Sequence, residues 1–199
     1  GNTWVASAFT LAFQVPNLFR RLLGEGALTA EFIPIFKHKE RNHGETEMWR
    51  TANAVISGLL VAAGGITLLA IVGISIALES GNFKPETVLM LRLLRWMFPY
   101  MLLACLAAVL IGMANARGHF FVPALGSVLL NVVMIASVLL LAPRMGLKLE
   151  EQIFGLALGV VVAGLAQAAF QMPGLRREGF RYAWVTPWHD PTVREVVGK

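Results

Sequence analysis

The sequence is poor in charge, in cysteine and in catalytic motifs. Charged residues make up 15% of its 199 residues and hydrophobic residues 56%, whereas a soluble domain usually carries about a quarter charged residues. Cys105 is the single cysteine, which excludes an internal disulfide. It lies in an apolar run, which favours a residue of the core. The sequence contains no phosphate-binding glycine loop, no nucleophile elbow and no His-Glu-x-x-His motif, and its histidines lack metal-ligand spacing. We therefore expect no enzyme, no metal and no cofactor.

The charge that is present is basic, with 17 Lys and Arg against 12 Asp and Glu. Most of it falls in short clusters between long apolar runs, where it meets lipid headgroups and sets orientation more naturally than it binds nucleic acid. No signal peptide is recognised. The first residue is not Met and the last residues resemble the start of another helix, so we expect a fragment of a longer protein.

Five long apolar stretches predict membrane-spanning helices: 1–19, 51–78, 96–116, 118–143 and 152–175. They are far longer than the ~10-residue strands of membrane β-barrels, and they are rich in Leu, Ala and Met. The polar segments between them, of which 37–50 is the longest, are expected to be loops. The predicted fold class is an all-α integral membrane protein, a polytopic helical bundle of about five transmembrane helices.

Lys and Arg are distributed unequally between the two predicted faces. The segment 37–50, the turn near Arg117 and the tail after Pro173 carry more of them than the opposite loops, so we expect these three segments in the cytoplasm. The first span would then run inward, and an odd number of spans would precede it.

Small and polar residues inside the spans leave alternatives open. Gly155 and Gly159 form a Gly-x-x-x-Gly pattern that suits either a dimer face or, as we favour, close packing within the domain. Asn131 and Gln167 could line a pore or bond a neighbouring helix.

Polar side chains recur on one side of the first span. At about 100° per residue they fall within a stripe of roughly 80°, with Arg20 at its edge: Thr3, Ser7, Thr10, Gln14, Asn17, Arg21 and Glu25. Such a stripe on a membrane helix indicates a water-filled cavity or a polar partner. Pro16 should bend the helix, so the stripe applies to each half more than to the whole.

The two adjacent arginines of this stripe suit a phosphate ligand. Arg20 and Arg21 can each bind phosphate oxygens in bidentate fashion, and Glu25 lies four residues after Arg21 and can pair with it. The alternative is that both arginines lie at the membrane edge and extend toward lipid headgroups. The residues alone leave both interpretations open.

The same region resembles the signature of the MurJ/MviN family, approximately D-A-F-x-x-A-F-x-x-P-N-x-x-R-R-x-x-x-E-G-A-x-x-x-x-F-x-P. The matching residues are Ala8, Phe9, Phe13, Pro16, Asn17, Arg20, Arg21, Glu25, Gly26, Ala27, Phe32 and Pro34. Further similarity at Phe98-Pro99-Tyr100 and at Gln171-Met172-Pro173 extends the resemblance along essentially the whole chain. One departure is Ser7, which stands where the family usually has Asp.

The resemblance implies a two-lobed flippase fold of fourteen helices in the bacterial cytoplasmic (inner) membrane. Residues 1–187 would supply helices two to six of the N-terminal lobe, and residues 188–199 the start of the helix leading to the missing C-terminal lobe. The implied function is the flipping of lipid II, the undecaprenyl-pyrophosphate-linked peptidoglycan precursor, by alternating access for cell-wall synthesis. The expected partners are lipid II, membrane lipids and the missing lobe, and not nucleic acid.

The candidate substrate-binding residues are therefore Ser7, Gln14, Asn17, Arg20, Arg21 and Glu25. The resemblance implies that Arg20 lines the cavity, whereas the stripe favours Arg21. Because Ser7 replaces the family Asp, either the cavity is more cationic or another acid compensates. The alternative functions are export of another polyprenyl-linked oligosaccharide and a non-transporting membrane scaffold.

Overall fold

The computed structural model describes residues 3–22 and 28–187, and over these residues the protein is helical with no strand. The predicted all-α class is thus confirmed. In chain order the elements are α1 Thr3–Arg20, α2 Leu28–His43, α3 Glu45–Ser80, α4 Pro85–Met97, α5 Pro99–Ala116, α6 Phe121–Ala136, the π-helical turn η2 Ser137–Leu141, α7 Ala142–Met145 and α8 Leu149–Arg177.

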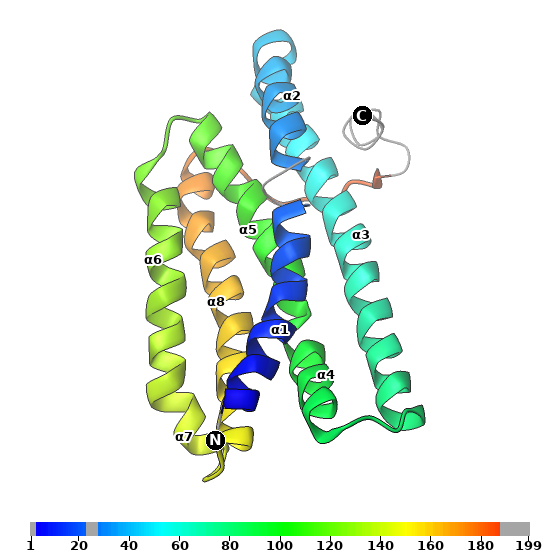
Figure 1. The fold of residues 1–199 in the computed structure, drawn as a ribbon. Coiled ribbons are helices and arrows are strands. Elements are labelled where there is room, and N and C mark those ends of the chain that lie inside the picture. Colours follow the sequence, from blue (N-terminus) through cyan, green and yellow to red (C-terminus); the bar gives the residue numbers. More distant parts are fainter. Residues whose placement is uncertain (1–2, 23–27, 188–199) are drawn as a thin grey trace.

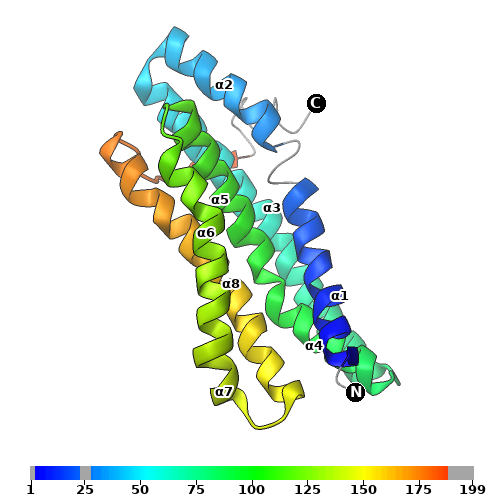
Figure 2. The ribbon, with the colours of Figure 1, turned by 60° about the vertical axis from the view of Figure 1, so that its left-hand side comes forward.

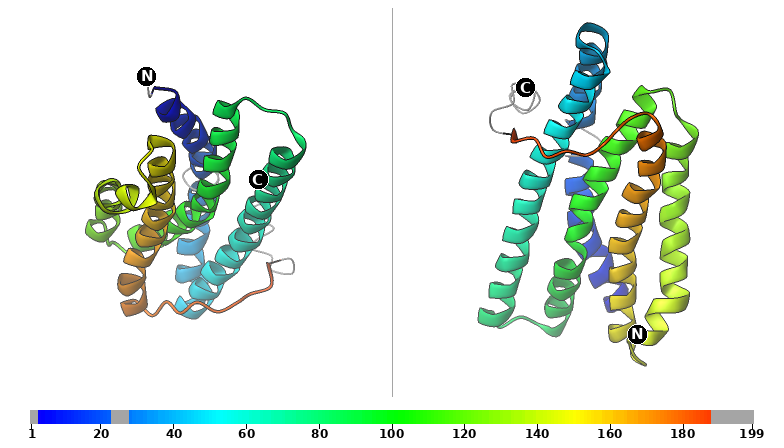
Figure 3. Two further views of the ribbon diagram at one scale, coloured as in Figure 1. Left: turned by 90° about the horizontal axis from the view of Figure 1, so that it is seen from below. Right: turned by 180° about the vertical axis from the view of Figure 1, so that it is seen from behind.

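Helix α5 lies at the centre of the bundle (Figures 1 and 3). It packs against α1, α2, α3 and α8, while α6 lies outside and packs mainly along α8, as Figure 2 shows. The turns at 81–84 and 146–148 lie at one end of the bundle. Gly44, the turn 117–120 and the segment 178–187 lie at the other, which we call the basic end (Figure 1). The alternation of loops between two ends is that of a multi-pass protein, and the predicted orientation stays a prediction.

The buried apolar side chains form two clusters in the described part of the chain. One joins α2, α3 and α5 through residues such as Phe36, Met48 and Met101. The other joins α1, α4 and α8 through residues such as Val5 and Leu93. Cys105 belongs to the first cluster and is fully buried, as expected for a core residue.

Within the described residues, four helical stretches are long and apolar enough to cross a membrane: Glu45–Ser80, Pro85–Ala116, Phe121–Met145 and Leu149–Arg177. They correspond to the last four of the five predicted spans. The first predicted span also forms a helix, α1, but it is not among these four. Its polar stripe and Arg20 lower its mean hydropathy, so α1 needs polar surroundings on one side.

The prediction that residues 37–50 form a loop is wrong. Both flanking helices continue into this polar segment and are interrupted only at Gly44, which has a φ of 85°. Lys, Glu, Arg and Met favour helix as strongly as apolar residues do, so a polar composition marked the end of a span but not the end of a helix. Gly44 takes the left-handed conformation that glycine adopts without strain.

The predicted span 96–116 corresponds to α5, and the helical stretch extends before it to Pro85. Arg95 lies inside this stretch, and its Nη1 donates a hydrogen bond of 3.3 Å to Ser75 Oγ on α3. The helix is interrupted between α4 and α5, because Pro99 has no N–H to continue the helical hydrogen bonds.

The Gly-x-x-x-Gly face packs inside the domain, as we favoured. A Cβ added to Gly155 would lie 2.7 Å from the backbone N of Ala142, and one added to Gly159 would lie 2.4 Å from Ser137 Oγ. Both contacts fall on the wide π-helical turn and α7, so the two glycines let this irregular segment lie directly against α8.

Candidate substrate-contact face and two surface pockets

The polar stripe of α1 faces away from the bundle described here. The opposite side of the helix, with Val5, Ala8 and Ala12, is buried against α4 and α5. Ser7, Thr10 and Gln14 are exposed, and Asn17 and Arg20 are half-buried. The stripe is therefore not enclosed by the helices present, which agrees with a polar surface that meets something outside this bundle.

Arg20 and Arg21 differ in their surroundings. The Nε of Arg20 donates a hydrogen bond of 2.9 Å to Asn17 Oδ1, which ties two candidate residues together. Arg21 is exposed and lies in a π-helical turn that follows α1. This wider turn changes the angular spacing on which the stripe rested, and it leaves Arg21 exposed while Arg20 is half-buried. Glu25 lies outside the described residues.

A cavity of about 450 Å³ lies beside the stripe, between the first turns of α1 and α4. Ser7 and Leu11 line it from α1, while Glu86 and Met90 line it from α4. The cavity thus places a carboxylate from α4 beside Ser7. Sequence reasoning missed Glu86, because an acid that follows Lys84 and Pro85 marks only the start of a helix, and nothing local tells which helix will pack against it.

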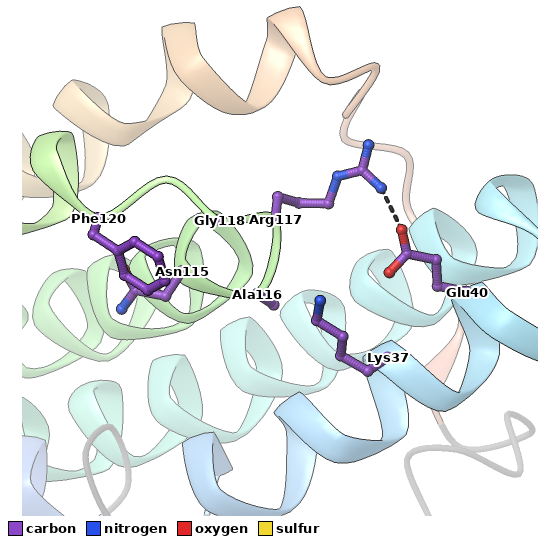
Figure 4. A pocket seen from close by; sticks show the side chains of 7 residues that line it. All are labelled: Lys37, Glu40, Asn115, Ala116, Arg117, Gly118 and Phe120. Carbon is purple, nitrogen blue, oxygen red and sulfur yellow. Dashed lines mark hydrogen bonds and ion pairs between the residues drawn. The ribbon is translucent and has the colours of Figure 1, made fainter.

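A second cavity, of about 350 Å³, lies at the basic end near the turn between α5 and α6. Figure 4 shows Lys37 and Glu40 reaching toward it from α2, opposite Asn115 and Arg117, with the Phe120 ring at its other side. The dashed line in Figure 4 marks the ion pair of Arg117 with Glu40, which joins the two walls of this cavity.

Arg117 is the centre of a cluster that joins four parts of the chain. Besides Glu40 on α2, its guanidinium contacts Glu45 at 3.0 Å on α3 and Glu178 at 2.9 Å after α8. It also lies over the Trp49 ring, 5.9 Å from its centroid. From the sequence, Arg117 is only a topology signal, because all three carboxylates lie at least 61 residues away from it along the chain.

The acid–base properties of this cluster follow from these contacts. Burial alone would lower the pKa of the Arg117 guanidinium, but hydrogen bonds to Glu178 and Glu45 and the negative charge of Glu40 outweigh burial and raise it. The pKa of the Glu178 carboxyl is lowered, first by its hydrogen bond of 2.9 Å to His119 and then by that to Arg117. Both shifts favour the charged forms of Arg117 and Glu178, whose ion pair connects the turn after α5 to the end of α8.

Other predicted polar residues have structural roles in the described protein. Gln167 Nε2 donates a hydrogen bond of 2.9 Å to the Gly126 carbonyl, so it bonds a neighbouring helix, which was one of the two alternatives. Asn131 is exposed on α6. Among the described residues, no group of His, Cys, Asp and Glu could hold a metal ion.

The fold and the exposed stripe define an α-helical, multi-pass membrane protein with one cationic, polar helix face. The sequence profile of the family described as "Lipid II flippase MurJ" matches residues 1–199. The chain is 36% identical over 204 residues to a "Probable lipid II flippase MurJ" of Bdellovibrio bacteriovorus, covering 97% of this chain and 38% of that protein. It is 33% identical over 185 residues to the "Lipid II flippase MurJ" of Burkholderia cenocepacia, covering 89% of this chain and 34% of that protein.

The chain therefore belongs to the lipid II flippase MurJ family, which confirms the resemblance seen in its signature. The family is one of transporters and not of enzymes, and the chain is a multi-pass protein of the bacterial inner membrane. It spans 38% of the length of the Bdellovibrio relative. The assignment of residues 1–187 and 188–199 to the parts of a two-lobed protein stays a prediction, and residues 188–199 lie outside the described residues.

Proposed function

We propose that the protein to which this chain belongs flips lipid II across the cytoplasmic membrane by alternating access, and that the stripe of α1 contacts the lipid-linked pyrophosphate. The observation that carries the proposal is the position of exposed Arg21 and half-buried Arg20 at the end of a helix whose other side is buried. A paired guanidinium site on an open helix face suits an anionic cargo that must be bound and released.

The remaining candidate residues support this site in defined ways. Asn17 holds Arg20 through its hydrogen bond, which orders the guanidinium before the cargo arrives. Gln14 and Ser7 continue the same face toward the other end of α1, and both are exposed. Glu25, four residues after Arg21, is proposed to pair with that arginine in the empty state. The second lobe, the lipid tail and the surrounding membrane lipids would complete the site.

The test is complementation by the full-length parent gene in a bacterium depleted of its own lipid II flippase. We expect rescue by the parent and failure of an Arg20→Ala/Arg21→Ala variant that is expressed and inserted equally well. The matched control is Arg176→Ala/Arg177→Ala, which removes another adjacent arginine pair at a helix end. If arginine pairs act only as membrane-edge anchors, both double variants should behave alike.

Two other outcomes would change the proposal. Rescue by the Arg20→Ala/Arg21→Ala variant would keep the function but return the two arginines to the role of membrane-edge anchors. No rescue by a well-expressed, inserted parent would indicate another polyprenyl-linked cargo or a non-transporting scaffold. Transport of another polyprenyl-linked oligosaccharide by the purified parent in vesicles would then decide between these two, because a scaffold moves no cargo.

A further inference from the structure

The segment that follows α8 is not a loose connection. Residues 178–187, which we call the strap, leave the end of α8 in extended form and cross the basic end of the bundle to α3, as the right-hand view of Figure 3 shows. Consecutive parts of the strap contact the bundle through two ionic contacts of one carboxylate, an aromatic contact and three hydrogen bonds. Each contact falls on a residue of the turn after α5 or of α3.

The root of the strap is held by charge. The carboxylate of Glu178 contacts Arg117 through one oxygen at 2.9 Å and His119 through the other at 2.9 Å. Arg117 is in turn held by Glu40 and Glu45, so the root is connected to α2 and α3 as well as to the turn after α5.

The middle of the strap is held by burial and by a backbone hydrogen bond. Phe180 is 1% exposed and packs on the Trp49 ring of α3, with the centroids 5.6 Å apart. One helical turn further along α3, Asn53 Nδ2 donates a hydrogen bond of 3.0 Å to the Arg181 carbonyl. A buried side-chain amide on an apolar helix needs such a partner, because an unpaired one is costly.

The far part of the strap is held by a single serine of α3. Ser57 Oγ accepts a hydrogen bond of 3.3 Å from the Val185 N–H and lies 3.2 Å from the Tyr182 hydroxyl. Trp49, Asn53 and Ser57 follow one another at four-residue spacing, so they share one side of α3. All three contact the strap: Trp49 through Phe180, Asn53 through the Arg181 carbonyl, and Ser57 through Tyr182 and Val185.

We infer that the strap is a permanently docked part of this bundle, so that the pivot between the bundle and the chain that follows lies beyond Pro187 and not at the end of α8. The inference rests on the proposed alternating access, in which the following part of the protein moves against this one. Release of the strap would expose Phe180 and leave Asn53 and Ser57 without partners on a membrane helix. The strap therefore moves with α3 through the transport cycle.

The experiment fixes the strap to α3 in the full-length protein, with Cys105→Ala and any other cysteine removed. Ser57→Cys and Tyr182→Cys are introduced together, because the hydroxyl groups of these two residues are in contact. Cysteine is shorter than tyrosine, so a short, reducible thiol cross-linker spans the remaining distance. We expect the cross-linked protein to transport within about twofold of the same protein before cross-linking. Loss of transport on cross-linking, restored when the linker is reduced, would overturn the inference.

A second measurement does not depend on transport. In membrane vesicles, a thiol-reactive maleimide should label Ser57→Cys at least about tenfold more slowly than Ser80→Cys, an exposed position on the same helix, because local opening must precede reaction at a protected site. Equal labelling rates, or faster labelling of position 57 when lipid II is added, would overturn the docked strap. Failure of the parent to flip lipid II, with position 57 still protected, would contradict the proposed function and leave the docking standing.

Discussion

The close contact between α8 and α7 predicts a large effect for a single added methyl group. A Cβ at position 155 would lie 2.7 Å from both the N and the Cα of Ala142. Ordinary contacts between carbon atoms are about 3.5–4.0 Å, so the two backbones must separate by about 1 Å. Unlike a side chain, the Ala142 backbone cannot rotate away, and the separation loosens the packing around the π-helical turn.

The magnitude follows from two opposing terms. Overpacking against rigid backbone costs about 2–3 kcal/mol, while Ala in place of Gly favours the helix by about 1 kcal/mol. Gly155→Ala should therefore lower the free energy of unfolding by about 1–2 kcal/mol. The matched control is Gly64→Ala on α3, where an added Cβ meets nothing within 4 Å. The free energy of unfolding of this control should rise by up to about 1 kcal/mol, from helix propensity alone.

The assay is thermal unfolding of the purified full-length protein in detergent, followed by tryptophan fluorescence. Trp96 packs edge-on against Phe154, the residue before Gly155, with the ring centroids 5.8 Å apart, and so reports on this contact. We expect a lower Tm for Gly155→Ala and an unchanged or higher Tm for Gly64→Ala. If Gly155→Ala raised the Tm as much as the control, α7 could not lie against α8 as described.

Three further outcomes are expected. The pKa of the Glu178 carboxyl is lowered in the folded protein, so this group stabilises the fold above pH 4.5, and the stabilisation is lost as the pH falls toward the lowered pKa. Glu178→Gln should therefore reduce the loss of unfolding free energy at acid pH. An unchanged dependence of stability on pH would contradict the cluster. Arg20→Ala alone should reduce transport by roughly tenfold or more, as expected for a lost charged hydrogen bond. The loss should be larger than for Arg21→Ala, because Asn17 orders Arg20. Equal losses would contradict a larger role for Arg20 than for Arg21. Cys105 should resist maleimide in native membranes and react after denaturation, since it is fully buried; rapid native labelling would refute its place in the core.

The helices were predictable because long apolar runs without charge have few alternatives in a membrane. The stripe of α1 was predictable for a related reason, since helical periodicity puts its polar residues on one side whatever surrounds them. Ser7, Thr10 and Gln14 are exposed, so this part of the stripe does not face the core of this bundle. Whether Arg20 and Arg21 bind cargo was not decided by periodicity, and it remains a proposal for experiment.

What sequence reasoning missed depends on contacts between distant segments. Polar composition suggested a loop at 37–50, although its residues favour helix once Gly44 provides the break. Glu86 and Arg117 entered the prediction only as charges in loops, because the helices that surround them come from other parts of the chain. The strap was read as a basic tail for the same reason, since Asn53 and Ser57 give no local sign that they hold it.

The length of α3 has a practical consequence for imaging. Its 36 residues make a helix about 54 Å long, against a hydrocarbon core of about 30 Å. Together with α2, which packs along its first part, it forms a helical hairpin with its apex at Gly44. A small protein fused at this apex through continuous helices would extend rigidly from the bundle and would serve as an alignment marker in electron microscopy.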